Sequence, residues 1–328
     1  MIRKFAFVCF VFSVFTTVLA FAQQRPDWDK IQVKFQKLTE NVYMIQFVSP
    51  AGGTVGANAG AFVGDDGVVL VDPGFAQAGP KLEAAIKTIS DKPVKYLLNT
   101  HWHGDHTGGN AYFGENAIII AQDNVRKRME TGDSALSPDS LKSLIREHFP
   151  PSPPAALPVL TFNDQLTLHI NGGEIRAVHF PHGHTDSDSV IFYPEDKVVQ
   201  TGSDFVNFNP SGFPTIDLDN DGSGGPQGAI AALGYIMDHT PNDVKVIPAH
   251  GDLASKVEVG RYLAILKDTT AAVQAGIGQG KSLEQLKQEK VLAKWEYLNT
   301  RIVKSDVYLE AVYRSLSKKN ASANSRAK

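Results

Sequence analysis

The sequence predicts an α+β protein built as a four-layer αβ/βα sandwich, in which two β-sheets pack face to face and helices cover their outer surfaces. Short β-branched and aromatic segments form two groups, before and after a proline-rich stretch at 149–154, and helical patterns accompany each group. Of the 328 residues, 42% are hydrophobic and 20% are charged, which is typical of a globular protein with a sizeable core.

The charge balance limits the partners of the protein. It has 32 basic and 35 acidic side chains, and its formal charge is −3. No stretch concentrates Lys and Arg in the way that a phosphate backbone requires. We therefore expect a small-molecule substrate and no nucleic-acid partner.

Residues 1–22 have the pattern of a secretory signal peptide. Arg3 and Lys4 precede the apolar run Phe5–Leu19, and a small-x-small sequence follows at 20–22. The run is shorter than the roughly 20 apolar residues that cross a bilayer, so we expect a secreted or periplasmic protein without a stable membrane anchor. The only cysteine, Cys9, lies in this segment, so a metal site in the mature chain must use imidazole and carboxylate.

The first half of the mature chain is expected to form one sheet with helices against it. Its predicted strands are rich in β-branched and aromatic residues and lie at 31–38, 41–48, 61–63, 68–71, 94–98 and 118–121. Apolar residues repeat with a helical period from Leu82 to Ile89, and this helix should end near Pro93. A second helix is expected at 122–130.

The proline-rich stretch at 149–154 has the composition of a linker, but strand patterns resume directly after it, so we interpret it as a loop inside a single domain, 23–317. The expected strands of the second half are 166–170, 174–180, 189–193, 197–200 and 244–247. The expected helices are 227–239, followed by a helical C-terminal part at 254–277, 282–291 and 304–317. We expect the polar tail, 318–328, to be disordered.

One loop after a buried strand is crowded with metal-ligand side chains. His101, His103, Asp105 and His106 lie within six positions of the sequence NTHWHGDHTGGN, which begins at Asn99. In extended backbone, positions 101 and 103 share a face, and the glycines let 105 and 106 face a second point. A solvated polar turn is the alternative, but three neighbouring imidazoles would repel one another on protonation. The loop therefore predicts ligands for two metal ions.

The pattern H-x-H-x-D-H followed by T-G-G-N resembles the metallo-β-lactamase superfamily. Later motifs fall in the order of that family: LVDPG at 70–74, HGHT at 182–185, TGSD at 201–204 and PAHG at 248–251. The resemblance covers most of residues 31–251, and Ala249 departs from it by replacing a glycine. It implies the metallo-β-lactamase fold and hydrolysis with two zinc ions.

The resemblance also implies a ligand for each position of the two zinc ions. Carried over residue by residue, it gives the first ion His101, His103 and His184, the second ion Asp105, His106 and His250, and both ions the bridging Asp204. Asp105 and His184 are the expected catalytic residues. A hydroxide shared by the two ions would be the nucleophile, so no Ser or Cys nucleophile is needed.

Three features near these motifs have two interpretations each. Asp72 is expected to accept hydrogen bonds from loop amides or from a liganding imidazole; alternatively, it only ends a strand. His182 is the alternative to His184 as third ligand of the first ion, but the Gly-His-Thr match favours His184. The glycine-rich segment Ser49–Gly60 is either a lid over the site or a plain surface loop.

The substrate stays open among several classes. Relatives that hydrolyse β-lactams usually carry Cys or Ser in place of Asp204, and the cysteine-bearing ones have a cation in place of Asn207, yet the cysteine-free, His-rich ligand set is similar to one lactamase subclass. We therefore expect a zinc hydrolase that opens a cyclic amide such as a β-lactam. The second interpretation is a lactonase or other ester or thioester hydrolase, and the third is a non-catalytic metal-binding module.

Overall fold

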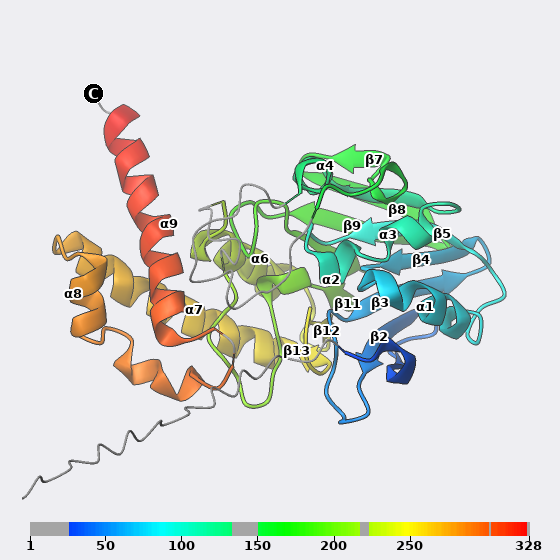
Figure 1. The fold of residues 1–328 in the computed structure, drawn as a ribbon, viewed down its shortest axis with the longest axis horizontal. Coiled ribbons are helices and arrows are strands. Elements are labelled where there is room, and N and C mark those ends of the chain that lie inside the picture. Colours follow the sequence, from blue (N-terminus) through cyan, green and yellow to red (C-terminus); the bar gives the residue numbers. More distant parts are fainter. Residues whose placement is uncertain (1–25, 133–149, 217–222, 302, 327–328) are drawn as a thin grey trace, which may run out of the picture.

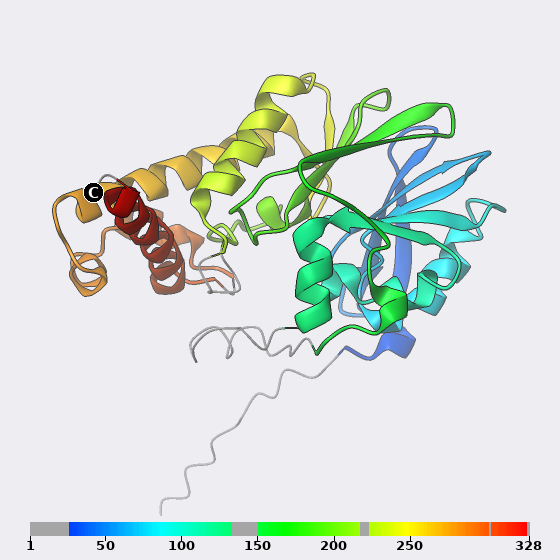
Figure 2. The same cartoon turned by 90° about the horizontal axis from the view of Figure 1, so that it is seen from above.

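The computed structural model describes residues 26–132, 150–216, 223–301 and 303–326, so the predicted signal segment lies outside the described residues. Two β-sheets pack together at one end of the molecule, and the last helices of the chain, coloured yellow to red, lie at the other end (Figures 1 and 2). Among the described residues, no helix has both the length and the apolar content needed to cross a bilayer.

The first sheet has seven strands and the second has six. In spatial order the first sheet contains β1 (Gln32–Lys37), β2 (Val42–Val48), β3 (Ala59–Gly64), β4 (Gly67–Val71), β5 (Val94–Asn99), β6 (Ile118–Gln122) and β7 (Leu160–Phe162). The second contains β13 (Ala254–Ser255), β12 (Lys245–Ile247), β11 (Val198–Gln200), β10 (Ser189–Tyr193), β9 (Gly173–His179) and β8 (Gln165–Ile170). Strands β4 to β7 are parallel, as are β11 and β12, and the other neighbours are antiparallel.

The α-helices of the described residues are α1 (Gly79–Ile86), α2 (Gly104–Thr107), α3 (Asn110–Phe113), α4 (Asp123–Thr131), α6 (Pro226–His239), α7 (Lys256–Gly278), α8 (Leu283–Gln288) and α9 (Ser305–Arg326). Short 3-10 helices lie at Trp28–Lys30, Ala76–Ala78, Pro154–Ala156, Gly202–Asp204 and Ala293–Leu298.

The three largest apolar clusters of the described residues hold the layers together. Between the sheets, Val71 and Leu98 pack with Ile191 and Ile247. On the outer face of the first sheet, side chains of α1 and α3 pack against strands β2 to β5. On the outer face of the second sheet, α6 and α7 pack against β10 to β12. Burying each large apolar side chain contributes about 1.5–3 kcal/mol. The layers follow the order helix, sheet, sheet, helix, which confirms the expected four-layer sandwich.

Several elements differ from those expected. The His-rich loop contains two short helices, α2 and α3. The helix expected from residue 254 begins at Lys256 because Ser255 caps it, and residues 254–255 instead pair with β12 as strand β13. The Ser255 side chain accepts from the Val257 amide, and Glu258 accepts from the Ser255 amide at 3.0 Å. Strand β7 was not expected, because only one of its three residues is buried and the sequence shows no sustained alternating pattern there.

The last helix is longer than expected. Helix α9 runs to Arg326, whereas we expected disorder from residue 318 onward. The residues from 318 to 326 include no Gly or Pro, so no residue there interrupts the helical backbone.

The topology brings distant motifs to one edge of the sandwich. Strands β4 and β5 are parallel neighbours, so Asp72 and the His101 loop follow their adjacent carboxyl ends. Strands β11 and β12 are also parallel neighbours, and they are followed by Asp204 and His250. His184 lies in the connection between β9 and β10. Five segments from both sheets therefore meet at one place.

Candidate metal centre

The two halves of the His-rich motif have different backbone conformations. His103 is extended and immediately precedes α2, whose four residues include Asp105 and His106. The change from extended chain to helix turns the side chains of 101 and 103 toward one point and those of 105 and 106 toward another. The expected division of this loop between two ligand groups is therefore visible in its backbone.

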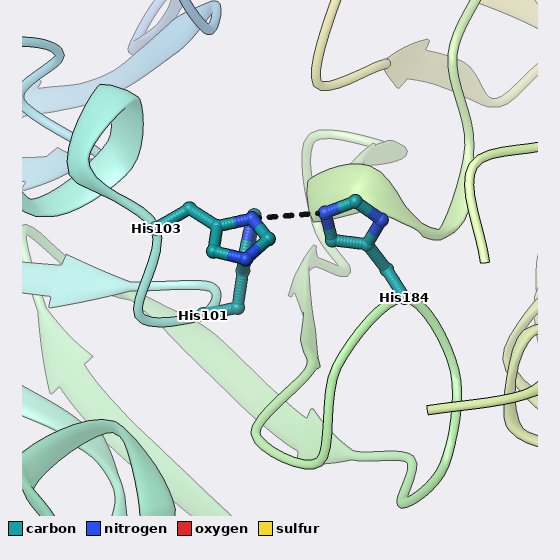
Figure 3. Close-up of side chains that lie close together, drawn as sticks. All are labelled: His101, His103 and His184. Atoms are coloured by element: carbon teal, nitrogen blue, oxygen red, sulfur yellow. Dashed lines mark hydrogen bonds between the residues drawn. The ribbon is translucent and has the colours of Figure 1, made fainter. Parts of the chain in front are cut away.

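Three buried imidazoles form the first ligand group, which we call the first triad: His101, His103 and His184. The first two come from the loop after β5, and His184 reaches them from the second sheet (Figure 3). His103 Nδ1 lies 3.2 Å from His101 Nε2 and 3.0 Å from His184 Nε2. Three ring nitrogens of buried side chains thus converge on one point.

The spacing of these nitrogens fits a zinc ion. Zinc binds histidine nitrogen at about 2.0–2.1 Å in tetrahedral sites, which puts neighbouring ligand nitrogens about 3.3 Å apart. Burial, followed by the neighbouring imidazoles, holds the pKa of His101 and of His184 well below the usual value, so both rings are neutral at pH 7. Neutral imidazole is the form that binds a metal.

Hydrogen bonds on the far side of each ring orient the donors. His184 Nδ1 donates to the carbonyl of Thr215 at 2.6 Å, and His101 Nδ1 contacts Thr100 Oγ1 at 3.1 Å. With the proton on Nδ1, the lone pair of Nε2 faces the centre of the triad.

A second triad, made of Asp105, His106 and His250, lies beside the first. Asp105 Oδ2 lies 3.4 Å from His250 Nε2 and 3.8 Å from His106 Nε2. Burial would raise the pKa of Asp105, but the imidazoles of His106 and His250 lower it, so the carboxyl is ionised. The side chains of Asp105 and His250 are 18% and 26% exposed, so this triad borders solvent.

Asp72 is hydrogen-bonded to the second triad directly and to the first triad through Thr100. Its Oδ2 accepts from His106 Nδ1 at 2.8 Å and from Thr100 Oγ1 at 2.7 Å, while its Oδ1 accepts from the Thr100 amide at 2.8 Å. Although burial would lower the pKa of His106, the carboxylates of Asp105 and Asp72 raise it. Asp72 therefore orients the ring of His106, which agrees with the first of its two interpretations. Its φ of +55° is one that Asp tolerates.

Asp204 lies next to the first triad but belongs to neither group. Its Oδ1 accepts from the His184 amide at 3.1 Å, and within the described part of the chain its buried Oδ2 has no hydrogen-bond partner. Burial raises the pKa of Asp204 to about 7. An unpaired oxygen at this place suits a cation, and the bridging role of Asp204 stays a prediction.

His182 and His184 differ in position relative to the other two imidazoles. His182 is exposed, has a φ of +64°, and donates from Nδ1 to the Ser223 carbonyl at 2.7 Å. The structure thus brings together His184, and not His182, with His101 and His103.

The glycine-rich segment Ser49–Gly60 touches the second triad. The carbonyl of Gly56 accepts from His250 Nδ1 at 3.0 Å. Gly56 has a φ of +71°, and a Cβ there would lie 2.8 Å from the Phe75 ring, so only glycine fits. Whether this segment also closes over a substrate stays a prediction.

Sequence reasoning missed three polar residues that contact the two triads. Thr100 Oγ1 contacts the rings of His101 and His106, and Ser203 Oγ lies 3.4 Å from His106 Nε2. Thr100 and Ser203 both lie inside sequence motifs that were recognised, so their position in those motifs could have identified them. Thr215 accepts from His184 across a sequence gap of 31 residues, and no motif marks it.

Together, the fold and the two triads define a metallohydrolase. The family model described as the metallo-beta-lactamase superfamily matches residues 52–225, more than half of the chain, and the chain belongs to that superfamily.

Individual relatives share this fold. The chain is 27% identical over 210 residues to a metallo-beta-lactamase type 2 of Elizabethkingia meningoseptica, covering 62% of this chain and 72% of the relative. It is 25% identical over 236 residues to an atrochrysone carboxyl ACP thioesterase of Aspergillus fumigatus, covering 67% of this chain but only 46% of that relative. A metallo-beta-lactamase structure from Pontibacter korlensis superposes with a TM-score of 0.55 at 20% identity, covering 72% of this chain and 99% of that one.

Proposed function

We propose that this protein is a zinc-dependent hydrolase that holds two ions and opens a cyclic amide of the β-lactam type. The observation that carries the proposal is the pair of adjacent triads, in which ring nitrogens and one ionised carboxylate converge on two points. When bound, the two ions would supply activated water and polarise the carbonyl of the substrate.

The residues of the chain have distinct parts in this proposal. His101, His103 and His184 would hold the first ion with neutral rings, and Asp105, His106 and His250 would hold the second. Asp204 would bridge the ions through the oxygen that has no protein partner in the described residues. Asp72 and Thr100 keep the rings of His101 and His106 in the tautomer that presents Nε2.

The open side of the centre indicates where the substrate meets it. Asp105 and His250 are partly exposed, whereas the first triad is closed. We propose that the substrate approaches the second triad, where ionised Asp105 accepts a hydrogen bond from the attacking water. His184 contributes by holding the first ion in place.

An ester or thioester hydrolase is the second candidate. Asp204 favours it, because a carboxylate there is typical of the broader hydrolases in the family. The likeness to a thioesterase over 67% of this chain also supports it. The likeness to a metallo-beta-lactamase, which spans 72% of that relative, favours the lactam.

Metal content tests the first part of the proposal. We expect two equivalents of zinc to stay with the purified protein after gel filtration. Fewer than two equivalents in wild-type protein supplied with zinc would contradict the two-ion scheme.

Substrate class is tested by a panel that contains a chromogenic cephalosporin, an acyl-homoserine lactone, a thioester and a phosphodiester. We expect the fastest turnover with the cephalosporin. Preference for the lactone or thioester would favour the second candidate, and no turnover of any compound by zinc-loaded protein would favour a metal-binding module.

We also propose that the protein is exported after cleavage behind Ala22. Support comes from the basic residues, the apolar run and the small-x-small sequence of the first 22 residues. Amino-terminal sequencing of protein from a bacterial periplasmic fraction should begin at Gln23. Uncleaved protein in the cytoplasmic fraction would contradict the export proposal.

A further inference from the structure

The segment 205–216 connects the metal centre to the C-terminal helices. It begins directly after Asp204, and near its end the Thr215 carbonyl accepts the hydrogen bond from His184 Nδ1 at 2.6 Å. This segment is therefore in direct contact with the first triad. Its conformation decides where the oxygen that orients His184 lies.

The C-terminal helical part, 256–326, holds this segment along its length. The contacts are ring packing and side-chain donors to backbone carbonyls: Phe205 against Tyr262 at 5.2 Å, Phe213 against Tyr308 at 5.1 Å, Thr300 Oγ1 to Ser211 O at 2.7 Å, and Arg301 to Asn209 O at 3.0 Å and Pro210 O at 3.1 Å. The segment between two metal ligands is thus shaped by helices that lie beyond the residues matched by the family model.

Thr215 is anchored on two sides. Its amide donates to the hydroxyl of Tyr262, a buried residue of α7, at 3.3 Å. Its own hydroxyl donates to the Ser203 carbonyl at 3.1 Å. The residue that orients His184 is therefore fixed both to the metal-site loop and to the C-terminal helices.

We propose that Tyr262 is a positioning residue for the first triad. By holding the Thr215 amide, its hydroxyl keeps the Thr215 carbonyl directed at His184 Nδ1, and this leaves His184 Nε2 free for the metal. The inference rests on the proposed function, because it requires that His101, His103 and His184 bind an ion. It makes the affinity for that ion depend on a side chain that touches neither the ion nor its ligands.

The test compares two tyrosines that each lose one hydroxyl. Tyr262→Phe removes the acceptor of the Thr215 amide and keeps the ring against Phe205. Tyr308→Phe is the matched control, because Tyr308 is also buried in the C-terminal part and packs on the same segment, but its hydroxyl pairs with Thr269 at 2.7 Å.

Zinc dissociation constants are measured on metal-free, full-chain protein by competition with a chromophoric chelator. Direct partners of liganding histidines change metal affinity about 10–100-fold, so this more distant contact should raise one of the two dissociation constants by about three- to tenfold in Tyr262→Phe. Tyr308→Phe should leave both constants unchanged, even where it lowers the denaturant midpoint. The cobalt-substituted protein gives a second readout, since only Tyr262→Phe should change the visible ligand-field spectrum.

Equal dissociation constants for wild type and Tyr262→Phe would overturn the inference, as would equal effects of the two variants. If Tyr262→Phe does not fold, Thr215→Val replaces it, because loss of the bond to Ser203 loosens the same carbonyl and should weaken the same ion. Wild-type protein that binds no zinc would instead overturn the proposed function, and the inference with it.

Discussion

The two triads differ in burial and in charge. The first is made of three buried imidazoles, and burial lowers the pKa of two of them. The second contains an ionised carboxylate, and two of its side chains reach solvent. We therefore expect the first triad to hold an ion permanently, and the second to hold an ion and meet the substrate.

The largest expected effect comes from removing one ligand of each triad. His101→Ala and His250→Ala should each lose one zinc equivalent, and because an ion contributes several kcal/mol of transition-state stabilisation, hydrolysis should fall by about 10³-fold. Metal analysis after gel filtration and initial rates measure both effects.

A matched control for these variants is His169→Ala, since His169 is exposed on β8. It should keep both equivalents and the full rate. Two zinc equivalents in both His101→Ala and His250→Ala would contradict the division of the ligands into two triads.

The next effect compares the residues that orient the imidazoles of each triad, Asp72 for His106 and Thr100 for His101. Asp72→Asn keeps the size of the side chain but removes the charge that pairs with His106, so affinity at the second triad should fall about 10–100-fold. Thr100→Val removes the hydroxyl that contacts His101 and should weaken the first ion by a smaller factor. Chelator competition resolves the two constants, and an unchanged second constant in Asp72→Asn would show that Asp72 has no part in metal binding.

How much of this centre was predictable depends on how far apart its parts lie in the sequence. His101, His103, Asp105 and His106 were visible because they are crowded into one loop. The strands that precede Asp72 and this loop were also predicted, but their parallel pairing was not. The contact between Thr215 and His184 was not predictable, because it arises from the packing of segment 205–216 on the C-terminal helices.

The fold shows the same limit. The strands with clear β-branched patterns were predicted within a residue or two, and the four layers followed from their order. Helix α2 was missed because Gly104–Thr107 has no hydrophobic period and too few residues to display one. The full length of α9 was missed because a polar composition was taken as a sign of disorder.

A smaller expected effect is the pH dependence of stability in the variant Asp204→Asn. In the folded metal-free protein burial raises the pKa of Asp204 from its ordinary 3.8 to about 7, so the folded state holds this proton more tightly than the unfolded state. The contribution of this protonated carboxyl to the free energy of unfolding is complete below pH 3.8 and is lost as the pH rises toward 7. With a chelator, the unfolding free energy of Asp204→Asn relative to wild type should therefore rise by at least about 1 kcal/mol between pH 5 and pH 8.

Zinc should reverse the sign of that comparison at pH 8, because the ionised carboxylate then has a cation to bind. Denaturant unfolding of both proteins, with zinc and with chelator, measures it. The same relative stability under both conditions would indicate that Asp204 bridges no ions.

The smallest expected effect is at His182, which lies outside both triads. His182→Ala should leave both zinc dissociation constants within about twofold of wild type, since its ring is exposed and donates to the Ser223 carbonyl rather than facing either triad. Isothermal titration with zinc measures both constants. Loss of one ion in His182→Ala would indicate that His182, and not His184, is the third ligand of the first ion.

Anomalous diffraction at the zinc edge, on crystals grown with zinc, tests the two-triad assignment most directly. It should give two peaks, one bounded by His101 Nε2, His103 Nδ1 and His184 Nε2 and the other by Asp105, His106 and His250. A single peak, or peaks that lie away from either set of side chains, would contradict the assignment.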